Sequence, residues 1–222
     1  AYIAAAVKKD GYDLKVLDAE ALNLGIKESV DAVIEKNIDV LGITATTPLV
    51  SIASEIAKAV KKKHPSIKII LGGPHASSMP TETLKQFEDL DYVVFGEGEV
   101  TVSELLKAIS QDKEPYDIAG VGFRNKGKII INKKREFIKN PDTIEFPLRE
   151  FFPNEKYLDP QNFSGVYTLV ATSRGCPYQC IFCGSAAVWG KSVRFRSPEN
   201  ILDELEVIVK ELNIRNIYFT DD

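Results

Sequence analysis

The chain has 222 residues, of which 44% are hydrophobic and 27% are charged, so it carries enough apolar side chain for a packed core. Its formal net charge is -4 at pH 7, which argues against a nucleic-acid partner. No apolar run approaches the ~20 residues that a membrane span requires, and we therefore expect a cytoplasmic protein without a membrane span.

Helical and strand patterns alternate through residues 1–112. Apolar residues at spacings of three and four predict helices over residues 1–9, 27–36, 49–63, 81–87 and 100–110. Short apolar runs between them predict strands at residues 14–18, 39–44, 68–71 and 92–95. This alternation predicts a parallel sheet with helices on both faces, of the flavodoxin-like (Rossmann-like) α/β class. Because the pattern opens on a helix, we expect a first strand upstream and a longer parent polypeptide.

Glycine, hydroxyl and charged residues follow three of the predicted strands, at the edge of such a sheet where ligands bind. Paired glycines let a backbone approach a flat ligand closely, and hydroxyls offer short hydrogen bonds. The same residues also suit ordinary turns, and a single loop histidine is a weak sign of a metal ligand. The candidate binding residues are Thr44, Thr46, Thr47, Gly72, Gly73, Pro74, His75, Gly96, Glu97 and Gly98.

Residues 113–164 follow neither pattern, and we predict a β-hairpin and a linker there. Apolar runs at residues 120–123 and 129–132 flank Arg124, Asn125, Lys126 and Gly127, an arrangement that is typical of a hairpin. Prolines then recur through an irregular stretch. The simplest interpretation is a connector, and the alternative is a segment that sets two modules against each other.

Residues 165–222 predict one strand–helix–strand unit. A buried strand over residues 166–172 leads into a cysteine-rich loop at its carboxyl end, where barrel enzymes place their chemistry. Ser197 and Pro198 then begin a helix as its N-cap and first residue. A second strand at residues 216–220 completes the unit. The apolar residues that we expect on the buried face of the helix are Ile201, Leu205, Ile208, Val209 and Leu212.

All three cysteines of the chain lie close together, at Cys176, Cys180 and Cys183. An odd number at this spacing is a poor basis for disulfides, and clustered cytosolic thiols are more typical of metal ligands. A structural zinc site usually takes four protein ligands, and the two histidines, His64 and His75, lie about a hundred residues upstream. Three thiolates suit an iron–sulfur cubane with one open iron, while zinc and a redox thiol stay open as alternatives.

The segment RGCPYQCIFC, residues 174–183, resembles the signature of the radical S-adenosylmethionine (SAM) superfamily, CxxxCxxC with an aromatic residue before the last cysteine. The strand ends LGGPH and VVFGEGE are similar to those of the cobalamin-binding domain that precedes the signature in one branch. The resemblance covers nearly the whole chain. It implies a cobalamin-binding flavodoxin-like domain at residues 1–112, a hairpin and linker at 113–164, and the first part of a radical SAM (β/α) barrel at 165–222.

The resemblance implies that the three cysteines hold a [4Fe–4S] cluster whose open iron chelates SAM. It also implies that Phe182 contacts the adenine of SAM, although this residue would suit a core position too. Many family members end the second strand on Gly-Gly-Glu, where this chain has Thr220, Asp221 and Asp222. The two aspartates are therefore candidates to bind the amino group of SAM. Arg174 would either offset thiolate charge or form a loop salt bridge.

The chemistry implied by the resemblance is cleavage of SAM to a 5′-deoxyadenosyl radical, followed by methyl transfer or by radical rearrangement or cyclisation. Some members use methylcobalamin as a methyl carrier, and the cluster implies an electron donor such as flavodoxin or ferredoxin. The Asp-x-His-x-x-Gly motif of other cobalamin proteins is absent, so we expect no imidazole below the cobalt. The alternative is a non-catalytic corrin-binding or Fe–S or zinc structural module, or a domain that binds no corrin. A partial barrel would expose strand edges, so we expect this chain either to be incomplete for catalysis or to depend on self-association.

Overall fold

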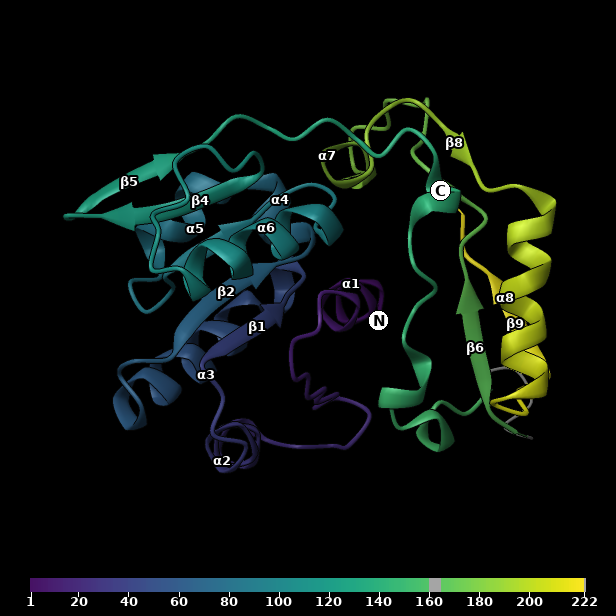
Figure 1. Ribbon diagram of the computed structural model, residues 1–222, viewed down its shortest axis with the longest axis horizontal. Helices are drawn as coiled ribbons and strands as arrows, with labels where there is room; N and C mark the ends of the chain where they lie inside the picture. Colours follow the sequence, from purple (N-terminus) through teal and green to yellow (C-terminus); the bar gives the residue numbers. More distant parts are fainter. Residues whose placement is uncertain (160–164, 222) are drawn as a thin grey trace. The chain divides into compact units, whose positions relative to one another are not determined.

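The computed structural model describes residues 1–159 and 165–221 and separates them into two compact units (Figure 1). Leu24–Phe137 form one unit, called here the sheet unit. Ala1–Asn23 group with the described residues from Ile138 onward, and together they are called the cysteine unit. The first residues of the chain thus pack with the segment that carries the cysteines. The segment boundaries predicted from the sequence stay predictions.

The sheet unit, all of which the structure describes, is built on a five-stranded sheet in the order β1–β2–β3–β4–β5 (Figure 1). The strands are β1 (Val40–Thr44), β2 (Lys68–Gly72), β3 (Tyr92–Val94), β4 (Val121–Asn125) and β5 (Lys128–Ile131). β1, β2 and β3 are parallel and are connected through helices. The predicted α/β class is confirmed. The helices are α2 (Ile26–Glu35), α3 (Val50–Lys63), α4 (Pro74–Ser78), α5 (Pro80–Gln86) and α6 (Glu99–Ser110), with a 3-10 turn, η1 (Thr47–Leu49).

The predicted hairpin is present as β4 and β5, and it is part of the sheet. Its turn runs through Lys126 and Gly127, whose φ angles are 47° and 78°, as two-residue hairpin turns prefer. β4 pairs antiparallel with β3, so that Val93 lies opposite Gly122. The hairpin therefore extends the parallel strands by two antiparallel ones, instead of standing apart from them as part of a connector.

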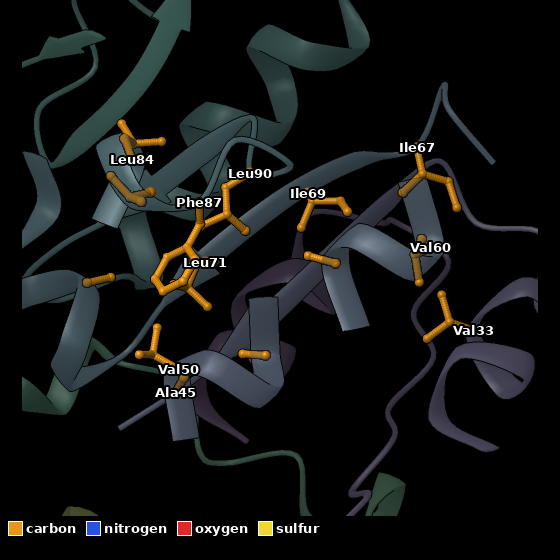
Figure 2. Packing of buried hydrophobic residues seen from close by; sticks show 14 of the residues in the cluster. Val33, Ala45, Val50, Val60, Ile67, Ile69, Leu71, Leu84, Phe87 and Leu90 are labelled. Atoms are coloured by element: carbon orange, nitrogen blue, oxygen red, sulfur yellow. The ribbon is translucent and has the colours of Figure 1, made fainter. Parts of the chain in front are cut away.

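The core of the sheet unit covers both faces of β2. Its consecutive residues Ile69, Ile70 and Leu71 are no more than 5% exposed, and neighbouring side chains of a strand point to opposite faces. Figure 2 shows Ile69 and Leu71 among other apolar side chains of the same core, including Val60 of α3 and Phe87 after α5. Burial of one such side chain contributes ~1.5–3 kcal/mol, so this packing holds the strand ends in fixed positions.

One predicted strand is wrong. Residues 14–18 are irregular and belong to the cysteine unit. Asp18 accepts a hydrogen bond from the backbone N–H of Ala21 at 2.9 Å and another from the hydroxyl of Tyr157 at 2.6 Å. The acid therefore closes a turn and is held by a distant tyrosine, which competes with pairing in a sheet.

The cysteine unit contains the predicted strand–helix–strand arrangement (Figure 1). β6 (Tyr167–Val170) and β9 (Asn216–Phe219) pair in parallel, and α8 (Pro198–Lys210) connects them. The Oγ of Ser197 accepts the N–H of Asn200 at 3.2 Å, so Ser197 is the N-cap, as predicted. Among the described residues, no helix is both long and apolar enough to cross a membrane. The other elements are α1 (Tyr2–Lys9), η2 (Pro141–Thr143), η3 (Arg149–Phe151), η4 (Asn154–Lys156), β7 (Ser173–Arg174), α7 (Ser185–Val188) and β8 (Arg194–Phe195).

The buried face of α8 differs from the predicted face at Val209 and Glu204, and the predicted Leu212 lies beyond the end of the helix at Lys210. Val209 is 40% exposed, whereas Glu204 is fully buried. Glu204 is held between two arginines: the Nη2 of Arg149 lies 2.6 Å from its Oε1, and the Nη1 of Arg196 contacts its Oε2. Arg149 comes from the predicted linker and Arg196 from the segment after β8. The buried ion pairs therefore tie both segments to α8.

Candidate functional site

The cysteines lie in a loop, called here the cysteine loop, that spans residues 175–193 and joins β7 to β8. β7 and β8 pair antiparallel, with Ser173 opposite Phe195 and Arg174 opposite Arg194, so they close the base of the loop. The N–H of Cys176 donates to the carbonyl oxygen of Gly190 at 3.2 Å and adds a bond across this base. The loop follows β6 closely, so the thiols are carried near the carboxyl end of that strand.

Gly175, immediately before the first cysteine, is required by the shape of the loop. Its φ is +101°, a left-handed conformation that side chains with a Cβ rarely adopt. A Cβ at this position would overlap the carbonyl oxygen of Ser192 on the returning arm of the loop. The close approach of the two arms therefore depends on glycine.

The three thiols are free and accessible. Cys180 and Cys183 are exposed and Cys176 is half-buried. The N–H of Ser185 lies 3.4 Å from the Sγ of Cys183, and the N–H of Cys183 donates to the carbonyl oxygen of Cys180 at 3.1 Å. In the part of the chain that the structure describes, no three His, Cys, Asp or Glu side chains are grouped closely enough to hold one metal ion. A three-thiolate site would thus require the loop to close.

Phe182 is not a core residue. Its exposed fraction is 88%, and its loop neighbours Tyr178 and Ile181 are 73% and 104% exposed. An aromatic ring that is open to solvent beside two exposed cysteines is available to stack on a planar ligand. This geometry removes the core alternative for Phe182, and its contact with adenine stays a prediction.

Arg174 is held by aromatic rings. Its guanidinium carbon lies 5.0 Å from the ring centroid of Tyr2 in α1 and 4.9 Å from that of Trp189 in the cysteine loop. The side chain is 7% exposed, so both cation–π contacts are largely shielded from water. Sequence reasoning missed Tyr2, because α1 and the cysteine loop are far apart along the chain, and it gave Trp189 no role.

Asp221, a candidate for SAM binding, contacts the segment that leads into the cysteine loop. Its carboxylate accepts hydrogen bonds from the backbone and side chains of Thr172 and Ser173, at 2.7–2.9 Å. Burial alone would raise the pKa of Asp221, but these hydrogen bonds outweigh it and hold the pKa below its ordinary value. Asp222, the second candidate, lies outside the described residues.

The predicted binding loops of the sheet unit meet at one edge, beyond the carboxyl ends of β1, β2 and β3. The N–H of His75 donates to the carbonyl oxygen of Ala45 at 3.2 Å, and the Nδ1 of His75 lies 3.2 Å from the Oγ1 of Thr47. The N–H of Gly96 donates to the Oγ of Ser77 at 3.0 Å. Ser77, which sequence reasoning missed, therefore joins the loop after β3 to the helix after β2.

The glycines of this edge serve two purposes. Gly73 has a φ of +91°, and a Cβ there would lie 2.5 Å from the Oγ1 of Thr44, so glycine lets two loops touch. Gly96 has a φ of +79°, and the nearest atom to its Cβ position, in Lys134, is 3.9 Å away. A Cβ at residue 96 would make only an ordinary contact with Lys134, so glycine is favoured there by the backbone conformation.

Some of the predicted residues of this edge are buried and others are exposed to solvent. His75 and Glu97 are buried at 6% and 4% exposure, and Pro74 begins the short helix α4. The exposed hydroxyls of the edge belong to Thr44, Thr46 and Thr47. The half-buried glycines of the predicted set are Gly72, Gly73, Gly96 and Gly98.

The chain is similar to known proteins along its whole length. Residues 1–106 match the B12 binding domain family. The chain is 35% identical over 223 residues to the uncharacterized methyltransferase PH0819 of Pyrococcus horikoshii, covering all of this chain and 48% of that protein. It is 28% identical over 234 residues to the anaerobic magnesium-protoporphyrin IX monomethyl ester cyclase of Rubrivivax gelatinosus, covering all of this chain and 40% of the cyclase.

Two further similarities are to a curated relative and to a solved structure. The cobalamin-dependent radical SAM methyltransferase TokK of Streptomyces tokunonensis is 26% identical over 200 residues, covering 88% of this chain and 29% of TokK. The structure of TsrM from Kitasatospora setae with cobalamin and a [4Fe-4S] cluster bound has the same fold, with a TM-score of 0.76 at 19% identity, covering all of this chain and 44% of TsrM.

The match of residues 1–106 to the B12 binding domain, together with relatives named as methyltransferases and as a cobalamin-dependent radical SAM methyltransferase, supports a cobalamin-binding protein of the radical SAM superfamily. Cobalamin binding is supported by the match of residues 1–106 to the B12 binding domain. The chain spans less than half the length of each of the four proteins named above.

Proposed function

We propose that the chain holds cobalamin at the loop edge of the sheet unit and a [4Fe–4S] cluster with SAM at the cysteine loop. The parent enzyme then transfers a methyl group or carries out a radical rearrangement or cyclisation, a reaction class that is supported by relatives named as methyltransferases and a cyclase. The observation that carries the proposal is the position of three free thiols in one loop whose base is fixed by β7 and β8.

The cysteine loop fits an iron–sulfur cluster by its donor chemistry. All three thiols are free, and two of them are exposed, so they can bind iron as thiolates. The N–H of Ser185 beside the Sγ of Cys183 would stabilise a thiolate there. Closure of the loop would bring Cys176 and Cys180 to the same iron–sulfur core. When bound, the cluster would supply the electron that cleaves the sulfonium of SAM.

Other residues of the loop would bind and orient SAM. Phe182 presents an exposed ring that can stack on adenine. Arg174, fixed between Tyr2 and Trp189, places a positive charge one residue before Gly175 and two before the first thiolate, where it reduces the charge repulsion of the ligand set. Asp222 stays the sequence-based candidate for the amino group of SAM.

The edge of the sheet unit fits the flat face of a corrin. It offers exposed threonine hydroxyls and half-buried glycine backbone. His75 is buried and its Nδ1 lies within hydrogen-bonding distance of Thr47, so we propose that no imidazole binds cobalt from below. When bound, cobalamin would supply a carrier for a methyl group.

The proposal includes a reducing, cytoplasmic setting and an electron donor such as flavodoxin or ferredoxin. Exposed thiols persist unpaired in such a compartment, and a cluster that reduces SAM must itself be reduced by one electron.

The test is the metal and corrin content of the protein reconstituted without oxygen. We expect brown protein with about four irons per chain and one cobalamin that co-elutes on gel filtration. Cys176→Ala, Cys180→Ala and Cys183→Ala should each abolish iron retention and leave cobalamin binding unchanged, whereas Tyr178→Ala, in the same loop, should retain both. Colourless protein with one tightly held zinc would support a structural zinc module and contradict the proposal.

A further inference from the structure

We propose that Asp221 is a positioning residue for the cysteine loop, and that its carboxylate fixes the turn between β6 and β7 instead of binding SAM. This inference rests on the proposed function, because it matters only if the loop holds the cluster. It replaces the sequence-based expectation that Asp221 binds the amino group of SAM.

The carboxylate of Asp221 accepts hydrogen bonds from the backbone and the side chain of two consecutive residues. Its Oδ1 accepts the N–H of Thr172 at 2.8 Å, the N–H of Ser173 at 2.7 Å and the hydroxyl of Ser173 at 2.9 Å. Its Oδ2 accepts the hydroxyl of Thr172 at 2.8 Å. Four bonds to two neighbouring residues fix both the direction and the rotation of this short turn.

These bonds occupy most of the acceptor capacity of the carboxylate. Three donors converge on Oδ1, which has about two lone-pair sites, and the hydroxyl of Thr172 takes one site of Oδ2. A ligand ammonium would therefore meet only the remaining site of Oδ2, unless it displaced one of these donors. Hydrogen bonds to a charged acceptor are the stronger kind, so this displacement is unfavourable.

The position of Asp221 connects the paired strands β6 and β9 to the segment that leads to the cysteines. It follows β9 directly, where the N–H of Thr220 still donates to the carbonyl oxygen of Val170 in β6 at 2.9 Å. Ser173 begins β7 and stands three residues before Cys176. The base of the loop is also closed by the two residue pairs of β7 and β8, by the bond from the N–H of Cys176 to Gly190, and by the bond from the N–H of Arg196 to the carbonyl oxygen of Thr172. The four Asp221 bonds add to these at the residues that lead into the loop.

The test separates positioning from ligand binding by comparing two substitutions. Asp221→Asn keeps one oxygen for the two N–H donors but loses the charge, whereas Asp221→Ala loses every bond. We expect Asp221→Ala to raise amide exchange in residues 172–176 about tenfold or more and to lower retained iron, while Asp221→Asn stays close to the parent in both. Asp203→Ala, an exposed acid on α8, is the matched control and should change neither.

A double variant, Thr172→Val with Ser173→Ala, removes the partner hydroxyls and leaves the carboxylate intact. We expect it to raise exchange and lower iron retention in the same direction as Asp221→Ala, and it keeps the test decisive if Asp221→Ala does not fold. Equal loss of SAM affinity in Asp221→Asn and Asp221→Ala, with parental exchange and iron content in both, would identify Asp221 as a SAM ligand and overturn the inference.

The two proposals fail in different ways. If the parent protein retains no iron, the proposed function fails, and the exchange measurements still decide whether Asp221 fixes the turn. If the parent retains iron and Asp221→Ala matches it in exchange, iron content and the electron paramagnetic resonance spectrum of the reduced cluster, the positioning role fails and the proposed function stands.

Discussion

At the scale of single residues, the base of the cysteine loop is fixed by side chains that are not cysteines. Arg174 is enclosed by two aromatic rings, Asp221 holds the preceding turn, and Gly175 allows the two arms of the loop to touch. The CxxxCxxC spacing indicates the ligands, but it carries no information about these supports. Tyr2 reaches the loop through the fold from a distant position, and no local pattern could reveal it. The position of Asp221 after the second strand marked it as a candidate, but its bonds to Thr172 and Ser173 depend on the fold.

Gly175→Ala should disrupt the loop at its base. The new Cβ would overlap the carbonyl oxygen of Ser192, and the left-handed backbone conformation at residue 175 would be strained. We expect a loss of about 1–3 kcal/mol in the free energy of unfolding, with a clear fall in iron retention. The matched control is Gly184→Ala in the same loop, where φ is -89° and no atom lies within 4 Å of the Cβ position. Equal iron content in the two variants would contradict this account, and denaturant titration with iron analysis measures both.

At the scale of elements, α8 is anchored through a buried carboxylate as well as an apolar face. Glu204 lies between Arg149 and Arg196, and all three side chains are at most 8% exposed. Paired charges of this kind are costly to break because one partner is left buried without compensation. The anchoring links the segment before β6 and the segment after β8 to one helix.

Glu204→Ala should therefore destabilise the cysteine unit strongly. It leaves two buried guanidinium groups without their carboxylate, and we expect a loss of about 3–5 kcal/mol in the free energy of unfolding. Glu206→Ala, two residues along the same helix, removes an exposed ion pair with Lys210 and should cost less than about 0.5 kcal/mol. Denaturant unfolding of both variants checks this difference, and similar midpoints would show that the buried pairs contribute little.

The sheet unit should lose stability at high pH through Tyr92 of β3. Burial, with the nearby charges of Asp91, Glu114 and Asp112, raises the pKa of Tyr92 to about 12. Because the folded pKa lies above the unfolded value of about 10, the neutral phenol stabilises the fold below pH 10, and this contribution is lost as pH rises toward 12. Between pH 10 and pH 12 the free energy of unfolding of the parent protein should fall relative to that of Tyr92→Phe. Tyr178→Phe, at a 73% exposed position, should follow the parent, and parallel curves for all three proteins would refute the assignment.

Element types were largely predictable because apolar periodicity is a local property. The parallel strands β1, β2 and β3, the hairpin and the cap of α8 all follow from patterns within a few residues. The features that could not be predicted depend on partner residues that are distant in the sequence. The run at residues 14–18 has no strand because Asp18 bonds to Tyr157, and Glu204 is buried because arginines arrive from residues 149 and 196.

At the scale of the whole molecule, the proposed cofactor sites belong to separate compact units. The loop edge proposed to hold cobalamin lies within Leu24–Phe137, and the cysteine loop lies in the unit that also contains α1. The match to the B12 binding domain nevertheless begins at residue 1, so it includes residues 1–23, which pack in the cysteine unit. This arrangement predicts that a local lesion at one site leaves the other cofactor in place.

Gly73→Val should therefore impair cobalamin binding and spare the cluster. A side chain at residue 73 would press on the Oγ1 of Thr44, 2.5 Å from the new Cβ, and would require a left-handed backbone that β-branched residues avoid. The loops after β1 and β2 would separate, and we expect cobalamin affinity to fall by about tenfold or more, the effect of some 1.4 kcal/mol. Iron content should match the parent.

Gly42→Ala in β1, where the Cβ position is open, should retain both cofactors. Titration with hydroxocobalamin, followed by iron analysis of the same samples, makes the comparison. Parallel loss of iron and cobalamin in Gly73→Val would show that the two sites depend on each other.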